Sequence, residues 1–362
     1  MAKKSCFILL VITLLLASTF PFGVAQESSY TDYSDGFFGT FDTWITILGY
    51  TTSPHIFQHA FDQGKSRFEH LHMLYDKYSS YEGITNIYTL NQQAGISPVV
   101  VEKDLLDLLL FSKEMQTSYP NTVNIAMGTV LEIWHDHRTV AQHSPTDASL
   151  PSLSLLQEAN NHTDIEDVVI DIENNTVFFS DPKLQLDVGA VAKGFATQIV
   201  ADEMASYGMP SFSISAGGNV ATGAPPMDGR SFWSIGIQDP SGHVLDPNAI
   251  IDSVYVSHSS VVTSGNYERF FSYEGENYHH IIDPKTLFPA NHLKQITIVC
   301  PDSGEADFLS TVLFLLPIEE GLALIDQMPG YEACWVSLDD TITTSSGWAL
   351  IARSGGVSNP AQ

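Results

Sequence analysis

The sequence predicts an α+β fold in which mixed sheets pack against helices. Segments with strand-like alternation and segments with helical spacing follow one another without a regular order along the 362 residues. Hydrophobic residues make up 44% of the chain, which is ample for a full globular core. The length by itself is compatible with two domains or with one large domain.

The first 25 residues have the pattern of an export signal. Lys3 and Lys4 precede an apolar stretch at 7–16, and Gly23-Val24-Ala25 provides a small-residue cleavage site. The apolar stretch is shorter than a membrane-spanning helix needs. We therefore expect a signal peptide at 1–25 and an exported mature chain in the periplasm, the cell envelope or the extracellular space. Membrane association is expected only if the segment is retained.

The next part of the chain predicts a linker, a strand and two helices. Residues 26–38 are rich in Ser, Tyr and Asp and predict the linker, and alternation at 41–47 predicts the strand. Ser53-Pro54 begins a helix, because serine caps a helix well and proline is tolerated in the first turn. Apolar residues continue at helical spacing to residue 78, and the leucine-rich segment 104–115 predicts the second helix.

The rest of the chain mixes short strands with helices. Asn174-Asn175 and Glu274-Gly275 predict the turns of two hairpins. Asp302 and Glu305 form a capping box at the start of a helix that reaches residue 316. The remaining segments are helices at 190–207 and 318–327 and strands at 168–179, 212–215, 233–237, 295–299 and 333–337. After removal of the signal, Cys300 and Cys334 are expected to be buried small hydrophobes.

The charge balance excludes some partners and constrains others. The chain has 15 Lys and Arg against 42 Asp and Glu, a formal net charge of −27. Such a surface repels phosphate backbones and anionic lipids, so we expect no nucleic-acid binding. A nucleotide ligand would be repelled as well. A nucleotide site must therefore carry its own positive charge, in the form of a divalent metal and a well-placed Lys or Arg.

The run from Asp187 to Gly194 lies where a strand gives way to a helix. Its small residues let the backbone approach a ligand closely, and the free N–H groups of a helix start favour an anion. Lys193 lies in the first turn, where it would meet a phosphate or pair with Asp187. The alternative interpretation is a tight strand-to-helix turn packed on a sheet.

A second candidate is the pair Asp307 and Thr311. They are four positions apart, so a helix presents both oxygens on one face. A carboxylate with a hydroxyl suits hard Mg²⁺ far better than zinc. The alternative interpretation is an N-terminal Asp that favours the helix dipole and a Thr that bonds to its own turn.

Histidines provide three weaker signals. One of the pair His279-His280, in a strand that ends at an Asp-Pro turn, would accept a proton, unless it is an ordinary half-buried strand residue. His135 and His137 form a His-x-His pattern that chelates zinc in some proteins, but a strand would bring both rings to one face in any case. The histidines of the helix that begins at Ser53-Pro54 are interpreted as ordinary surface or half-buried residues; they are His55, His59, His70 and His72.

Six segments occur in one order, namely 187–194, 216–219, 236–240, 263–265, 280–284 and 306–311. Together with 40–43 and 124–134, they resemble the ApbE family, the FAD:protein FMN transferases. The resemblance spans nearly all the mature chain and implies a single large domain at 39–355. Leu287 departs from the family, which usually has glycine there.

The resemblance implies a Mg²⁺-dependent transfer of the FMN moiety of FAD to a threonine hydroxyl of an acceptor protein, which carries a threonine flavinylation motif, with release of AMP. Mg²⁺ would be held by Asp307, Thr311 and the backbone carbonyl of Ala190, and His280 would be the base. The implied FAD contacts are Phe41 on the flavin, Tyr81 on the adenine, and Thr122, Val123, Asn124, Asp187, Lys193 and Ile281. The alternatives are an FAD pyrophosphatase, which would give free FMN and AMP, and a non-catalytic flavin-binding protein of the envelope.

Overall fold

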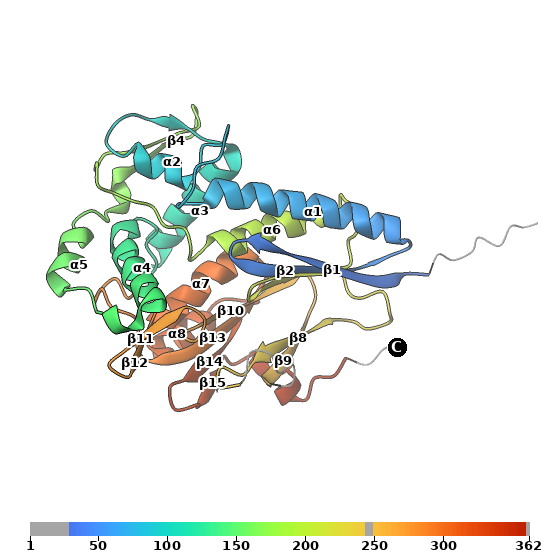
Figure 1. Cartoon of the computed structure of the whole chain (residues 1–362). Helices are drawn as coiled ribbons and strands as arrows, with labels where there is room; N and C mark the ends of the chain where they lie inside the picture. The colour runs from blue at the N-terminus through green and yellow to red at the C-terminus, as the bar shows by residue number, and fades with distance from the viewer. Residues whose placement is uncertain (1–28, 243–248, 360–362) are drawn as a thin grey trace, which may run out of the picture.

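The computed structural model describes residues 29–242 and 249–359, so the expected signal peptide lies outside the described residues. Its centre is an eight-stranded antiparallel sheet with the order β1-β2-β6-β7-β10-β13-β14-β15 (Figure 1). The eight strands are β1 (Thr31–Thr40), β2 (Thr43–Thr51), β6 (Phe212–Ala216), β7 (Asn219–Thr222), β10 (Ser259–Gly265), β13 (Leu293–Cys300), β14 (Glu332–Ser337) and β15 (Ile342–Thr344).

Three small antiparallel sheets surround the central one. They comprise β3 (Val99–Val100), β5 (Thr176–Phe179) and β4 (Val168–Asp171); β8 (Trp233–Gln238) and β9 (Ile250–Val256); and β11 (Phe270–Tyr273) and β12 (Glu276–His279). The α-helices are α1 (Pro54–Tyr75), α2 (Ile87–Gln92), α3 (Lys103–Ser118), α4 (Gly128–His143), α5 (Leu153–Asn160), α6 (Ala192–Met204), α7 (Ser303–Leu315) and α8 (Ile318–Ile325). Mixed sheets packed with helices confirm the predicted α+β class.

The central sheet is covered on both faces. Along β10, Val262 belongs to the large core formed with α1, α6 and α7, whereas its neighbour Val261 belongs to a second core formed with β8 and β9. Trp335 and Cys334 on β14 alternate in the same way. Successive side chains of a strand point to opposite faces, so this alternation places the helices on one face and the β8–β9 hairpin on the other. Both described cysteines are buried and free, as expected.

The N-terminal part of the domain differs from the prediction. Residues 31–38 belong to β1 and not to a linker, because two aromatics face α1. Tyr33 stacks on Phe57, and Phe37 meets Phe61 edge to face. Polar residues between these aromatics hide the apolar face in the sequence. The strand expected at 41–47 begins at Thr43, since residues 41 and 42 form the β1–β2 turn with φ values of 54° and 53°.

The predicted helix starts and hairpin turns are confirmed. The Ser53 hydroxyl accepts from the Ile56 N–H at the start of α1, and Asp302 accepts from the Glu305 N–H at the start of α7. The turns at 174–175 and 274–275 connect β4 to β5 and β11 to β12. α6 begins at Ala192, two residues later than expected, and ends at Met204.

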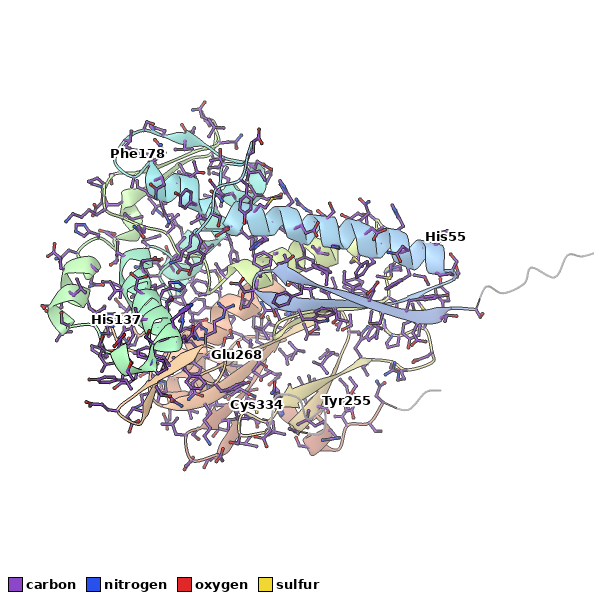
Figure 2. The ribbon with its side chains drawn as sticks, viewed as in Figure 1. His55, His137, Phe178, Tyr255, Glu268 and Cys334 are labelled. Carbon is purple, nitrogen blue, oxygen red and sulfur yellow. The ribbon has the colours of Figure 1, made fainter. Side chains whose placement is uncertain are left out.

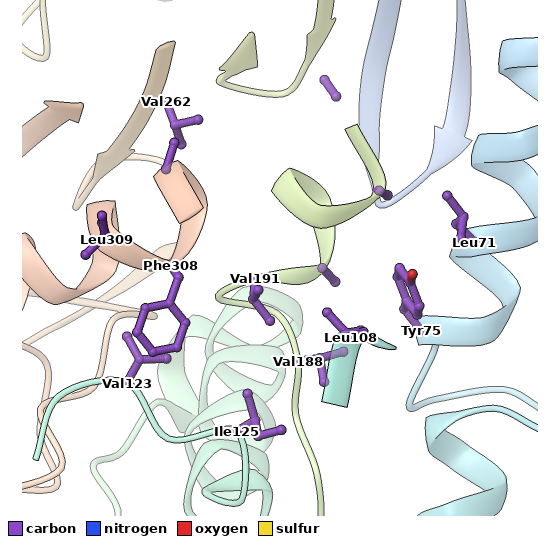
Figure 3. Packing of buried hydrophobic residues seen from close by; sticks show 14 of the residues in the cluster. Leu71, Tyr75, Leu108, Val123, Ile125, Val188, Val191, Val262, Phe308 and Leu309 are labelled. Atoms are coloured by element: carbon purple, nitrogen blue, oxygen red, sulfur yellow. The ribbon is translucent and has the colours of Figure 1, made fainter. Parts of the chain in front are cut away.

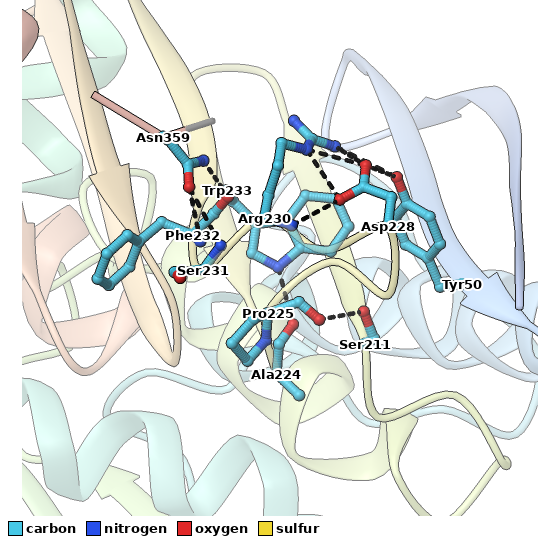
Figure 4. A network of polar contacts seen from close by, with 10 residues as sticks. All are labelled: Tyr50, Ser211, Ala224, Pro225, Asp228, Arg230, Ser231, Phe232, Trp233 and Asn359. Carbon is cyan, nitrogen blue, oxygen red and sulfur yellow. Dashed lines mark hydrogen bonds and ion pairs between the residues drawn. The ribbon is translucent and has the colours of Figure 1, made fainter. Parts of the chain in front are cut away.

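A polar network connects the end of β2 to the loop before β8. Asp228 accepts hydrogen bonds from the Tyr50 hydroxyl at 2.7 Å and from the Arg230 Nε at 2.9 Å (Figure 4). The Asn359 side chain closes the same region from the C-terminal segment, through the backbone of Ser231 and Phe232. Throughout residues 29–242 and 249–359, no helix combines the length and the apolar character that crossing a bilayer requires.

Candidate active site

A cavity of about 510 Å³ opens where α1, α4, α6 and α7 converge. Segments far apart in the sequence supply its walls: the β1–β2 turn, the end of α1, and the loops at 122–127 and 187–190. All but one of the candidate site residues line it, which are Phe41, Thr122, Val123, Asn124, Asp187, Ala190, Lys193, His280, Ile281, Asp307 and Thr311. The fold therefore assembles one site from residues spread over 270 positions of the chain.

Tyr81 is the exception, because it is not among the residues that line the cavity. It forms an isolated bridge with Ile84, and its hydroxyl donates to Asp76 at 2.7 Å. Tyr78, three residues earlier, lines the cavity instead and is 54% exposed. The cavity lining therefore does not support the adenine contact that was expected for Tyr81.

Close packing of α6 on α7 organises the end of the cavity that contains Asp307. Gly194 makes this packing feasible, because a Cβ there would lie 2.2 Å from the Ser303 carbonyl oxygen and 2.3 Å from the Asp307 Cβ. The Gly194 N–H donates to one oxygen of the Asp307 carboxylate at 2.8 Å. The other oxygen lies 3.4 Å from the Lys193 ammonium. The Asp307 side chain is thus fixed between the helix backbone and a lysine, with only 5% of its surface exposed.

Three oxygen donors at this end fit a hard divalent cation. No hydrogen bond among the described residues uses the Thr311 hydroxyl or the Ala190 carbonyl. The carbonyl lacks its helical partner because the Gly194 N–H points to Asp307 instead. A carboxylate, a hydroxyl and a free carbonyl are the ligand types that Mg²⁺ takes, usually completed by water and by substrate phosphate. The chemistry of the donor set therefore agrees with the Mg²⁺ ligands expected from the sequence.

Asp187 has a partner that differs from the expected one. Its carboxylate lies 3.0 Å from the Lys77 ammonium, which also lies 2.9 Å from Glu132, whereas Lys193 lies next to Asp307. Burial alone would raise the pKa of Asp187, but the Lys77 charge and the Gly189 N–H lower it below its ordinary value. Asp187 is therefore ionised at neutral pH. The alternative pairing of Asp187 with Lys193 is wrong.

In the loops at 122–127 and 187–190, valines pack into the core next to residues at the edge of the cavity. Val123 and Val188 are buried, and Val123 lies beside Phe308 of α7 (Figure 3). The neighbouring Asn124 is held by two bonds: its oxygen accepts from the Ala126 N–H at 2.8 Å, and its amide donates to the Thr163 carbonyl at 2.8 Å. This anchoring fixes the backbone of the 122–124 segment against the core.

His280, and not His279, has the environment of a reactive histidine. His279 is tied to the Ala290 carbonyl through Nε2 at 2.6 Å and accepts from the Ile281 N–H through Nδ1. His280 lines the cavity, and its buried Nδ1 has no hydrogen-bond partner within the described part of the chain. Burial, followed by the positive charge of Arg269 and other nearby cations, lowers the pKa of His280 to about 3. The ring is therefore neutral at physiological pH.

The β1–β2 turn brings Phe41 to the cavity in a strained conformation. Phe41 has a φ of 54°, and its N–H donates to Nδ1 of His72 at 3.3 Å. The two rings meet edge to face with centroids 5.4 Å apart. His72 is half-buried, as expected, but it also lines the cavity and holds this turn. Leu287, where the family usually has glycine, also has a left-handed φ of 62°.

The His-x-His pattern does not form a zinc site. Residues 128–143 are α4, so His135 and His137 lie two positions apart on a helix and not on one face of a strand. His135 lines the cavity, whereas His137 lies toward the outside and donates to the Ser149 carbonyl (Figure 2). In the part of the chain that the structure describes, no group of three His, Cys, Asp or Glu side chains is arranged to hold a metal.

Sequence reasoning missed several charged residues of the cavity. Lys77 follows the last turn of α1, and no local pattern connects it to Asp187, which lies 110 positions later. Arg138 belongs to the segment that was interpreted only for its histidines. Glu268 and Arg269, just before β11, were adjacent to the 263–265 segment, and this adjacency was the one signal that pointed to them.

Comparison with known proteins places the chain in the ApbE family, in agreement with the resemblance seen in its sequence. A model of the ApbE family matches residues 41–335. The chain is 34% identical to a FAD:protein FMN transferase of Treponema pallidum, over 71% of this chain and 72% of that protein. It is 30% identical to a FAD:protein FMN transferase of Klebsiella pneumoniae, over 72% of this chain and 78% of that protein.

Solved structures agree on the fold. An ApbE protein of Thermotoga maritima superimposes with a TM-score of 0.76 at 23% identity, over 89% of this chain and 99% of that one. The flavin transferase ApbE of Vibrio cholerae superimposes with a TM-score of 0.72 at 21% identity, over 89% of this chain and 99% of that one. The arrangement of sheets and helices described above is therefore the one these proteins share.

Proposed function

The chain belongs to the ApbE family, and from this premise we propose that it transfers the FMN moiety of FAD to a threonine hydroxyl of an acceptor protein and releases AMP. Two relatives at 34% and 30% identity that bear the name FAD:protein FMN transferase support the reaction class. The observation that carries the proposal is the convergence of Asp307, Thr311, the Ala190 carbonyl and Lys193 in one cavity.

The proposed Mg²⁺ ligands are Asp307, Thr311 and the Ala190 carbonyl. When bound, Mg²⁺ would neutralise charge on the pyrophosphate of FAD and so make its phosphorus atoms better electrophiles. Lys193, which contacts Asp307 at 3.4 Å in the structure, would add a second positive charge against the phosphate oxygens. These charges answer the problem of binding a dinucleotide to a protein with a net charge of −27.

The reaction requires one proton transfer, from the acceptor threonine hydroxyl to a residue of this chain. The acceptor threonine oxygen attacks the FMN phosphorus, the bond from that phosphorus to the bridging oxygen breaks, and the bridging oxygen leaves with AMP. His280 would take the threonine proton, because its ring is neutral and its Nδ1 has no partner among the described residues. The negative charge of bound FAD would offset the cations that lower the pKa of His280, and would thus raise its basicity.

The apolar part of the cavity suits the flavin. Phe41 and Ile281 line the cavity, and the anchored 122–124 backbone supplies a further wall. We propose that the ring lies against these residues, as the ApbE resemblance implies. Holding the ring and the pyrophosphate on fixed elements would place the FMN phosphorus at the attacking hydroxyl, and this positioning makes a large part of the rate enhancement in such reactions.

Mass spectrometry of an acceptor domain tests the proposed reaction. The mature chain is incubated with FAD, Mg²⁺ and an acceptor that carries a threonine flavinylation motif, and the acceptor should become heavier by one FMN while AMP appears. Asp307→Asn should abolish the transfer while the unfolding midpoint stays near that of the wild type. Asp339→Asn, an exposed carboxylate outside the cavity, is the matched control and should transfer normally.

The same experiment separates the alternatives. Free FMN and AMP in the absence of acceptor would identify an FAD pyrophosphatase. A yellow protein that produces no AMP and does not depend on Mg²⁺ would identify a flavin-binding protein without turnover. Full transfer by Asp307→Asn would refute the proposed metal ligands.

We also propose that the mature protein acts outside the cytoplasm, in the periplasm, the cell envelope or the extracellular space. The pattern at 1–25 supports this location. Fractionation of cells that express the full chain with a C-terminal tag tests it, because export and cleavage would give a shorter protein outside the cytoplasm. A full-length protein in the cytoplasmic fraction would contradict it.

A further inference from the structure

Charged side chains of both signs line the cavity, and the five carboxylates are Asp42, Asp76, Asp187, Glu268 and Asp307. Four of the chain's 15 lysines and arginines line it, namely Lys77, Arg138, Lys193 and Arg269. Carboxylate oxygens lie within 4.0 Å of both lysines, at 2.9 and 3.0 Å for Lys77 and at 3.4 Å for Lys193. Neither arginine has such a partner within the described residues, although the chain carries 42 acidic residues. Neither guanidinium group therefore forms a close ion pair with a described carboxylate, although Glu268 and Asp187 act on them from a greater distance.

Arg138 and Arg269 act on each other electrostatically. Burial lowers the pKa of Arg138, and the positive charge of Arg269 lowers it further. Arg138 is half-buried on α4, where its Nη2 donates to Nδ1 of His135 at 3.0 Å. Glu268, the acidic neighbour of Arg269, has no described cation within 4.0 Å, although its charge and that of Arg269 act on each other. The two like charges repel each other, so a ligand of opposite charge would relieve the repulsion.

His280 adds an independent observation. Its buried Nδ1 has no partner in the described chain, and Arg269, Arg138 and Lys193 are all close enough to lower its pKa. A buried nitrogen without a hydrogen-bond partner costs free energy, unless a ligand or a water supplies the partner. In the proposed reaction this Nδ1 accepts from the threonine hydroxyl, and the two forked guanidinium donors near it match the several oxygens of a phosphate group.

The position of Arg138 indicates which phosphate it would bind. Lys193, Asp307 and Thr311 come from α6 and α7, whereas Arg138 comes from α4. Beside it, the ring of His135 lies 5.2 Å from the exposed ring of Tyr78, which gives an aromatic surface suited to a purine base.

We infer that Arg138 and Arg269 bind the phosphate that leaves with the nucleoside monophosphate, and so form an anion site beside the Asp307 end of the cavity. The inference rests on the proposed function for the identity of the ligand. Binding of this phosphate would stabilise the charge that the leaving group gains when the pyrophosphate bond breaks. Arg is better suited than Lys to this role, because its planar fork contacts two phosphate oxygens at once.

Titration calorimetry of the mature protein with AMP and with adenosine tests the site without catalysis. The wild type should bind AMP at least about tenfold more tightly than adenosine, since hydrogen bonds to charged groups are worth that much. Arg138→Gln and Arg269→Gln should each weaken AMP about tenfold and leave adenosine unchanged. Arg138→Lys should fall between the wild type and Arg138→Gln. Arg353→Gln, at an exposed arginine outside the cavity, is the control and should change neither.

Unchanged AMP affinity in both glutamine variants would overturn the inference, and so would a wild type that binds AMP no more tightly than adenosine. An equal loss of AMP and adenosine binding would also overturn it, because it would indicate a structural role. Transfer by the wild type is measured in parallel. A wild type that flavinylates the acceptor while the variants keep their AMP affinity refutes only the anion site, whereas a wild type that binds AMP through these arginines but transfers nothing refutes only the proposed reaction.

Discussion

Replacement of Gly194 by alanine should disable the site through packing alone. The new Cβ would lie 2.2 Å from the Ser303 carbonyl oxygen and 2.3 Å from the Asp307 Cβ. Ordinary contacts between such atoms are about 3.5 Å, so α6 and α7 must separate by about 1 Å. Both obstructing atoms belong to the backbone or to its first side-chain carbon, and a rotamer change cannot move them away.

Two opposing effects set the expected loss of stability. Overpacking of this kind costs about 1–3 kcal/mol, and the two severe contacts place Gly194→Ala at the upper end. The gain in helix propensity from Gly to Ala offsets about 1 kcal/mol. The free energy of unfolding should therefore fall by about 2 kcal/mol. Because Gly194 also fixes Asp307 through its N–H, a displacement of about 1 Å should lower the transfer rate about a hundredfold.

Urea unfolding followed by tryptophan fluorescence measures the first quantity, and the rate of acceptor flavinylation measures the second. Gly236→Ala on β8 is the control, since its new Cβ would meet one methyl group of Ile250 at 3.3 Å and lies outside the cavity. A Gly194→Ala protein with wild-type stability and a wild-type rate would show that contact between α6 and α7 does not hold Asp307 in place.

Three further substitutions test the electrostatics. Lys77→Met should lower the free energy of unfolding, measured by urea denaturation, by about 3–5 kcal/mol, because it leaves the buried Asp187 carboxylate without its cation. A loss below about 1 kcal/mol would contradict the pairing. Asp228→Asn should cost about 1 kcal/mol at neutral pH, through its partly exposed pair with Arg230. Hydrogen bonds from Arg230 lower the pKa of Asp228, so this difference should be present above the ordinary Asp pKa and vanish as the pH falls below it. The pKa of His280 is lowered to about 3, so as the pH falls the unfolded state takes up the His280 proton before the folded state does. The free energy of unfolding of the wild type should therefore fall more than that of His280→Gln between about pH 7 and pH 4. Equal changes of the two free energies with pH would contradict the buried neutral ring.

Local patterns predicted the parts of the site that a single segment builds. The cap at Asp302 and the spacing of Asp307 and Thr311 come from one helix, where side-chain direction follows from the helical repeat. Here neighbours in sequence decide the local structure, so no knowledge of the rest of the chain was needed. The small residues at 187–194 were predicted to let the backbone approach a ligand, whereas Gly194 lets α6 pack closely against α7.

Pairings across the fold were beyond these patterns. The interpretation of residues 31–38 as a linker failed because the apolar face of β1 consists of two aromatics among polar residues, and only α1 reveals what they pack against. Of the two roles expected for Lys193, contact with a phosphate or pairing with Asp187, the second failed for a similar reason, since Lys77 approaches Asp187 from the end of α1. The role of His72, which accepts a hydrogen bond from the Phe41 N–H, depends on the position of the β1–β2 turn in the folded chain.

The sequence by itself determined the α+β class, the family, the negative charge and the identity of the oxygen donors, because these depend on composition and on residues within one helix or turn. The tertiary structure decided which cation meets which carboxylate. Among the described residues, it placed no carboxylate within 4.0 Å of Arg138 or Arg269. Ion pairing depends on distances of a few ångströms between segments that are remote along the chain. Such distances are set by how α1, α4, α6 and α7 pack, and packing is a property of the whole core.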